Sequence, residues 1–294
     1  MKNLLVNVFK TLFFFDLALV VINLIPDLKT KDPMKLLLWR EGMPLAVILF
    51  LTLFYLLIVD RRKFHIYEKK GKFKSGLFGL FIGAVVPSVI LGVMWLLKAF
   101  KITGFNKVDN IHYYILAMFF NAMAGELLFR GYLFKIYQKH QGFIFATVFS
   151  TALFFSMNHH LLKLSKLYIA NIILLQVFLC CMTDKAKGPF NIFARFVYTF
   201  ISGFILGNGM LSEDYPVFGK FAFSGKKLIN GGEYQIEGSV VTTVFLSLLI
   251  FFMLNRKYKL LSYLKKENLK RYMANIGNFF GAIFSFIRRS FSIR

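Results

Sequence analysis

The chain has 294 residues, of which 57% are hydrophobic and 38 are phenylalanine, and its formal net charge is +23. Long apolar runs of this composition exclude an ordinary soluble domain and indicate a polytopic helical membrane protein. The lysines and arginines cluster between the apolar runs, so we expect them to face anionic lipid and not nucleic acid. Cys180 and Cys181 are neighbours inside an apolar run, and they predict neither a disulfide nor a metal site.

About eight segments have the length that a bilayer demands. They lie near residues 5–26, 43–59, 76–97, 111–130, 142–159, 167–182, 190–210 and 238–255. The first contains Lys10 and Asp16 and is not followed by the cleavage site of a signal peptide. These spans predict an all-α transmembrane helical bundle.

The basic segments predict the orientation of the chain. Lysines and arginines crowd residues 61–74 and the tail after residue 255, and such segments belong on the cytoplasmic side. An even number of spans then places both termini in the cytoplasm. In residues 257–290 apolar positions recur at helical spacing opposite a basic face, which predicts an amphipathic helix lying on the membrane surface. A ninth span over 273–287 is the alternative.

We expect three parts along the chain. Residues 1–105 form N-terminal transmembrane helices, residues 106–255 a core domain, and residues 256–294 a basic amphipathic cytoplasmic tail.

Two charged residues, Glu126 and Arg130, stand at the end of the fourth span, where charge is costly and commonly serves a function. If that span continues to about residue 139 and turns at residues 140–142, Glu126 and His159 differ in depth by only about 7 Å. Such a carboxylate and imidazole predict a metal or acid–base site, with Arg130 on the same face as Glu126. The alternatives are a structural Glu126–Arg130 ion pair and a His159 that reaches the membrane boundary.

The string from Gly125 to Phe134, GELLFRGYLF, resembles the first motif of the CAAX-protease and bacteriocin-processing (CPBP) family of intramembrane metalloproteases, EExxxR. Phe155 and His159 match the family's second motif, FxxxH, in type, spacing and order. Residues 224–225 and 231–239 resemble a loop of many bacterial members. The resemblance covers about 110–255 and implies a bundle in the bacterial cytoplasmic membrane that cleaves a peptide or membrane protein with zinc.

The chain departs from this pattern at the positions that matter most for catalysis. Gly125 stands where the family has its catalytic glutamate, the general base. The third motif, HxxxN, falls without gaps on Phe196 and Phe200, and no histidine follows His160. A zinc site needs about three protein ligands, and the resemblance leaves Glu126 and His159.

Three functions therefore remain open. The first is a family member with weak or no protease activity, a pseudoenzyme that binds a peptide or membrane partner. The second is an active metal-dependent endopeptidase with a rearranged site, in which Glu126, Arg130 and His159 are catalytic and Glu126 and His159 bind zinc. In that alternative Glu233, Glu237 or Asn208 would have to fold into the site. The third is a transporter-like bundle, although matching broken helices in two halves are not evident.

Overall fold

The computed structural model describes residues 2–59, 72–186, 189–207 and 215–258. The helices and strands of these residues, in chain order, are α1 (Lys2–Leu24), α2 (Pro33–Phe54), η1 (Tyr55–Val59), α3 (Lys72–Leu96), β1 (Phe100–Phe105), α4 (Ile111–Glu126), η2 (Leu127–Leu133), α5 (Phe134–Gln141), α6 (Phe143–Met157), η3 (His159–Lys163), α7 (Lys166–Ala186), α8 (Phe190–Thr199), η4 (Phe200–Ile205), β2 (Gly219–Phe223), α9 (Lys227–Asn230), η5 (Gly232–Gly238) and α10 (Val240–Tyr258). The predicted all-α architecture is confirmed.

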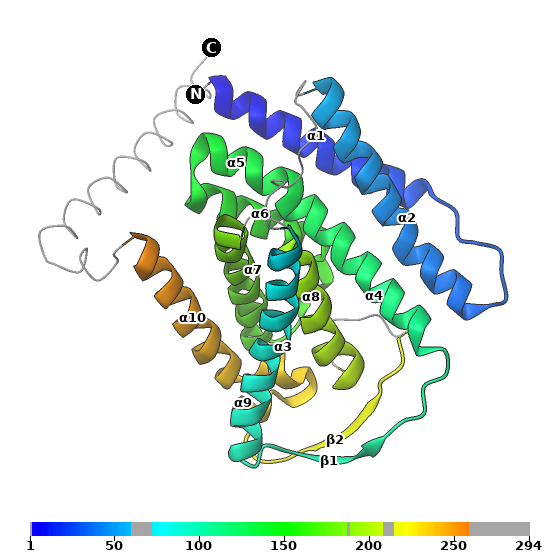
Figure 1. The fold of residues 1–294 in the computed structure, drawn as a ribbon, viewed down its shortest axis with the longest axis vertical. Coiled ribbons are helices and arrows are strands. Elements are labelled where there is room, and N and C mark those ends of the chain that lie inside the picture. The colour runs from blue at the N-terminus through cyan, green and yellow to red at the C-terminus, as the bar shows by residue number, and fades with distance from the viewer. Residues whose placement is uncertain (1, 60–71, 187–188, 208–214, 259–294) are drawn as a thin grey trace, which may run out of the picture. The chain divides into compact units, whose positions relative to one another are not determined.

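The chain divides into two compact units, Met1–Ser247 and Leu248–Arg294. The first unit contains every element up to the beginning of α10 (Figure 1). In the second, the structure describes the remainder of α10, so the predicted surface helix over 257–290 lies almost wholly outside the described residues. The three predicted parts of the chain stay a prediction.

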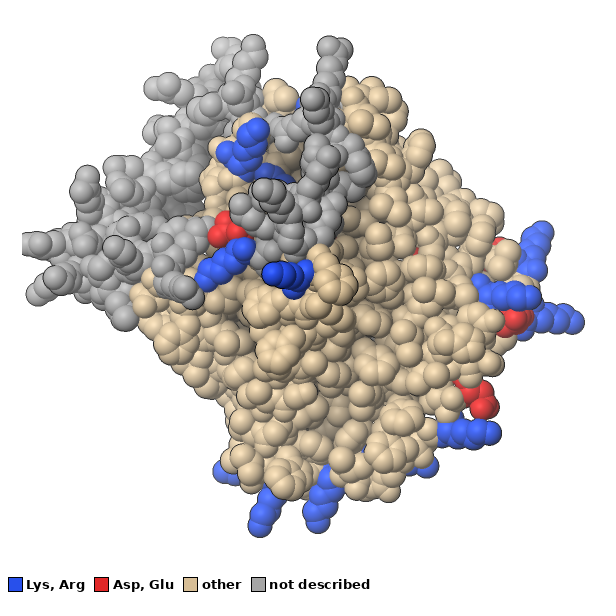
Figure 2. Space-filling model, in the orientation of Figure 1, with Lys and Arg blue, Asp and Glu red and all other residues tan. Residues whose placement is uncertain are grey.

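Five described helical segments are long and apolar enough to cross a membrane. They are Pro33–Ile58, Phe73–Leu96, Ile111–Gln141, Lys166–Lys185 and Gly232–Asn255. Two shorter apolar helices, Phe143–Met157 and Phe190–Ile205, fall where two further spans are predicted. On the face drawn in Figure 2, most of the described lysines and arginines lie at the margins of a broad uncharged area. The exact number of spans stays a prediction.

Local chemistry explains where several helices begin and end. The Asp32 carboxylate accepts hydrogen bonds from the backbone N–H groups of Met34 and Lys35, and Pro33 occupies the first turn, so α2 begins there. Arg40 of α2 donates a hydrogen bond to Asp27, which precedes the cap in the chain. This contact holds the pKa of the exposed Asp27 carboxyl below its usual value. Gly142, with φ of +90°, makes the predicted turn between α5 and α6.

Helix α3 packs closely against α8 because glycines line the contact. A Cβ on Gly79 would lie 3.1 Å from the Cα of Phe190, and one on Gly83 would lie 2.9 Å from the Cα of Ala194. These backbone-to-backbone distances leave no room for a side chain. The close contact fixes the position of α8, and therefore of the residues that follow Ala194.

A two-stranded antiparallel ribbon, β1–β2, was not predicted. Phe100 pairs with Phe223 and Phe105 with Gly219, with an irregular register between Ile102 and Gly104. β1 follows α3 and leads into α4, as Figure 1 shows. The ribbon pairs two segments that are more than a hundred residues apart in the sequence. The helices α4 and α8 lie between these two segments in the chain.

Candidate functional site

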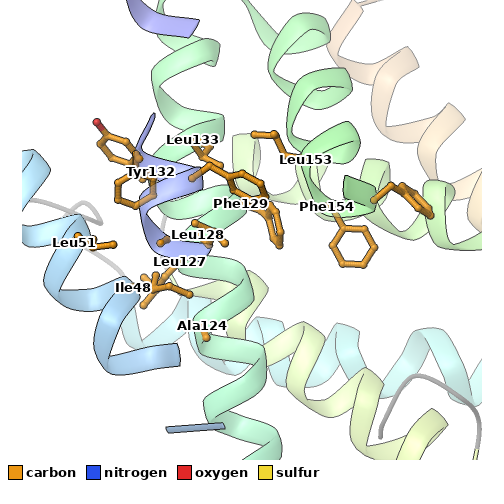
Figure 3. Close-up of a cluster of buried hydrophobic side chains, with 14 of the residues drawn as sticks. Ile48, Leu51, Ala124, Leu127, Leu128, Phe129, Tyr132, Leu133, Leu153 and Phe154 are labelled. Carbon is orange, nitrogen blue, oxygen red and sulfur yellow. The ribbon is translucent and has the colours of Figure 1, made fainter. Parts of the chain in front are cut away.

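The GELLFRGYLF segment lies in the most buried part of the first unit. α4 ends at Glu126 and continues as the π-helix η2, in which every residue from Leu127 to Leu133 is buried. A wider π-turn within a helix often occurs at a functional site. Figure 3 shows the apolar packing around this segment, with Ile48 and Leu51 of α2 and Phe154 of α6 among the surrounding side chains.

Glu126 and Arg130 form a buried ion pair across this junction. Arg130 Nη1 donates to Glu126 Oε1 at 2.5 Å, and the two residues are 3% and 1% exposed. Arg130 Nη2 also donates to the side-chain carbonyl of Gln176 in α7, which is itself buried. The charges expected from the sequence thus do come together, and they are held between three helices.

A second arginine, Arg195 of α8, joins this pair and was not predicted. Its Nη1 lies 3.5 Å from the same Glu126 oxygen, and its Cζ lies 6.0 Å from the centre of the Phe154 ring. Glu126 therefore meets two guanidinium groups, while its Oε2 has no hydrogen-bond partner among the described residues. In the sequence, Arg195 is a single charge within an apolar run, which marks it as unusual.

Gly125 lies directly against Arg195. A Cβ built on Gly125 would lie 3.1 Å from Arg195 Cζ and closer still to Nη1. Real Cβ atoms rarely come so near a neighbour, so the guanidinium occupies the volume that a side chain at this position needs. The geometry couples the missing side chain at residue 125 to the unexpected arginine at residue 195.

The segment that contains Glu126, Arg130 and Arg195 is similar to a known protein family. Residues 107–214 match the family model described as type II CAAX prenyl endopeptidase Rce1-like. This segment is Rce1-like. The match is consistent with the CPBP family and confirms the predicted resemblance. Together with the apolar helices, it supports an integral membrane protein. No curated protein and no solved structure matches the chain.

The residues that resemble the second CPBP motif, Phe155 and His159, span the end of α6. α6 ends at Met157, the backbone changes direction at Asn158, and His159 begins the 3₁₀-helix η3. His159 is exposed and its ring lies 6.4 Å from that of His160, whereas Glu126 is 1% exposed. The two residues thus differ in exposure, and a site shared by Glu126 and His159 stays a prediction.

The third CPBP motif, at Phe196 and Phe200, is occupied by aromatic packing. The Phe196 ring packs edge-on against Phe119 of α4, with centroids 5.6 Å apart. The Phe200 ring stacks on Phe204 at 5.3 Å. Both rings are partly buried and pack against an apolar cluster that includes Met118.

The residues of this region do not fit a zinc ion. Among the described residues, no group of three or more His, Cys, Asp or Glu side chains is placed to hold a metal. Around Glu126 the neighbouring charged groups are Arg130 and Arg195, which repel a cation. The predicted ligands Glu126 and His159 occupy different environments, as shown above.

A second buried carboxyl, Glu237, lies in η5 and is 1% exposed. Neither of its carboxylate oxygens has a partner within hydrogen-bonding geometry in the described chain, although the hydroxyl groups of Tyr198 and Ser202 lie close by. The Asn171 side chain fixes this loop by donating to the backbone carbonyls of Glu237 and Ser239, at 2.7 and 2.9 Å.

Proposed function

We propose that this Rce1-like protein has lost the metal-dependent proteolysis of its family and acts by binding a peptide or membrane partner. The observation that carries this proposal is the position of Arg195 against Gly125. The family's general base belongs at residue 125, and here a guanidinium fills the space that the base would occupy. A cation in that place opposes the binding of a metal ion, and a guanidinium, which stays protonated, cannot accept a proton from water.

Glu126 does not replace the base at residue 125. Its Oε1 already accepts a hydrogen bond from Arg130, and Arg195 lies on the same oxygen. The carboxylate is therefore already engaged in ion pairs with two guanidinium groups. A second positive neighbour also makes zinc binding at this carboxylate unfavourable.

The aromatic residues at the third motif support the same conclusion. A phenylalanine ring offers a metal no donor atom, and the rings of Phe196 and Phe200 fill their surroundings with apolar volume. Recovery of a site would need two buried polar side chains in place of these rings, which is costly without partners.

The orientation belongs to the same proposal. Both termini lie in the cytoplasm and the membrane is a bacterial cytoplasmic membrane, since the basic segments at 61–74 and after residue 255 follow the positive-inside pattern. Labelling of single cysteines introduced at Lys63 and at Lys107 with a membrane-impermeant reagent tests this in intact cells. Labelling of the cysteine at position 63 from outside the cell would show that the chain has the opposite orientation.

The experiment that tests lost proteolysis uses the full chain, purified in detergent. We expect less than one zinc per molecule by elemental analysis and no cleavage of a prenylated CAAX peptide. The triple variant Gly125→Glu, Phe196→His and Phe200→Asn should stay inactive, since Arg195 would pair with the new glutamate. Stoichiometric zinc with chelator-sensitive cleavage that Glu126→Ala abolishes would overturn the proposal.

A further inference from the structure

A small cavity lies beside Arg195, between α3, α6, α7 and α8. Its volume is about 20 Å³, enough for one water molecule or one small ion. Most of its wall is apolar, with Ile82 and Val86 on α3 and Phe178 on α7. The polar residues that line it are Gln176, Arg195, Tyr198 and Thr199.

Two of these residues carry donor atoms that are incompletely paired. Arg195 Nη1 is held by the ion pair to Glu126 Oε1 at 3.5 Å but lies outside hydrogen-bonding geometry, and the Tyr198 hydroxyl has no described partner within that geometry. A guanidinium N–H can only donate, and it is costly to leave a buried donor unpaired. No described Asp or Glu side chain lines the cavity, so its wall offers Arg195 no second negative partner.

The surrounding charges favour an anion as that partner. Within 4 Å, Glu126 is the one carboxylate of the described chain that faces Arg195, and its oxygen already accepts from Arg130. Glu41 acts on Arg195 from farther away, and its oxygens accept from Asn121 and Tyr215. Two guanidinium groups thus share one close carboxylate, and a second negative charge would balance them.

Glu237 competes with a ligand in the cavity for the Tyr198 hydroxyl. Its carboxyl lies close to the Tyr198 hydroxyl, so that hydroxyl can donate to Glu237 instead of to a molecule in the cavity. Binding therefore depends on Arg195, and Tyr198 contributes less.

We propose that this cavity binds a carboxylate or a similarly small monovalent anion, held by the guanidinium of Arg195. The ligand is either a free small anion or the charged end of a membrane amphiphile whose chain lies against the apolar wall. The proposal rests on the binding function proposed above and names the chemistry of what is bound. It uses Arg195, a residue that the family motifs do not include.

The test uses the full chain in detergent. A sulfate salt keeps the ionic strength constant, because sulfate is too large for the cavity. Formate and chloride serve as free anions, and decanoate is compared with decanol as the amphiphile. We expect a saturable rise of the thermal midpoint with an anion, because a ligand that binds only the folded state stabilises it. Saturation by formate or chloride identifies a free anion, and saturation by decanoate alone identifies an amphiphile.

Arg195→Gln should weaken the apparent Kd roughly tenfold or more, since it removes a charge-assisted hydrogen bond. Arg40→Gln, which removes an exposed arginine elsewhere, is the matched control and should bind as the native chain does. Equal binding by Arg195→Gln, or no saturable response in the native chain, would overturn the proposal.

If Arg195→Gln does not fold, Arg195→Lys takes its place, because it keeps the charge but loses the forked donor. Binding unchanged by that substitution would also count against the proposal. None of these measurements involves zinc or cleavage, so failure here is distinct from failure of the proposed loss of proteolysis.

Discussion

The guanidinium of Arg195 occupies the space that a side chain at Gly125 would fill, with Cζ 3.1 Å from the Cβ position. One residue lies in α4 and the other in α8, seventy positions away. The glycine at position 125 and the guanidinium of Arg195 against it are thus one structural feature. Changes at either position should depend on the other.

Gly125→Ala should destabilise the protein by about 1 kcal/mol, since the added methyl group displaces the flexible end of Arg195 from Glu126. Thermal unfolding in detergent measures the change. Gly131→Ala is the matched control, because a Cβ there meets its nearest side-chain atom at an ordinary 3.5 Å. That variant should be neutral or slightly stabilised.

In an Arg195→Ala background the cost of Gly125→Ala should disappear, giving a coupling of about 1 kcal/mol or more in a double-mutant cycle. Additive effects of the two substitutions would mean that the residues do not contact each other in the folded protein.

The close packing of α3 on α8 gives a second prediction. Gly83→Ala should lower the free energy of unfolding by about 1–3 kcal/mol, because its methyl group meets the backbone of Ala194, which cannot move as a side chain can. Gly92→Ala in the same helix has no atom within 4 Å of its Cβ and serves as the control. Equal midpoints for the two variants would contradict this packing.

Much of the fold was predictable because membrane spans have a strong composition signal. The runs that became α3 and α7 and the turn at Gly142 follow from apolar length and from glycine at a positive φ. The β1–β2 ribbon was not predicted, since its two strands are short and far apart in sequence. Their pairing is a tertiary contact that no local pattern reports.

The candidate site was predictable only where its residues share one helix. Glu126 and Arg130 are four positions apart, and the spacing alone places them together. The position of His159 depended on α6 continuing for two more residues, and helix ends are difficult to predict. The contribution of Arg195 depended on the rotation of α8 against α4, which the sequence does not specify.

The loop around Glu237 should depend on one side chain of α7. Asn171→Ala removes the donors to two buried carbonyls, and we expect it to destabilise the protein by about 1–3 kcal/mol. Thr243→Val is the matched control, since it loses the hydrogen bond to the Asn171 carbonyl oxygen but leaves both loop carbonyls paired. Thermal unfolding should place Thr243→Val between the native chain and Asn171→Ala. The opposite order would mean that Asn171 does not anchor the loop.

Glu126 should be required for folding, whatever the protein binds. Glu126→Gln leaves Arg130 and Arg195 without their close carboxylate, and breaking a buried ion pair in this way costs about 3–5 kcal/mol. Replacing both partners removes the uncompensated charge, so Glu126→Gln with Arg130→Gln should be more stable than Glu126→Gln alone. Unfolding midpoints and the yield of monodisperse protein measure both effects. Asp27→Asn, in an exposed ion pair with Arg40, should behave as the native chain. A Glu126→Gln protein as stable as the native one would show that the two arginines find other partners, and would leave Glu126 free for a different role.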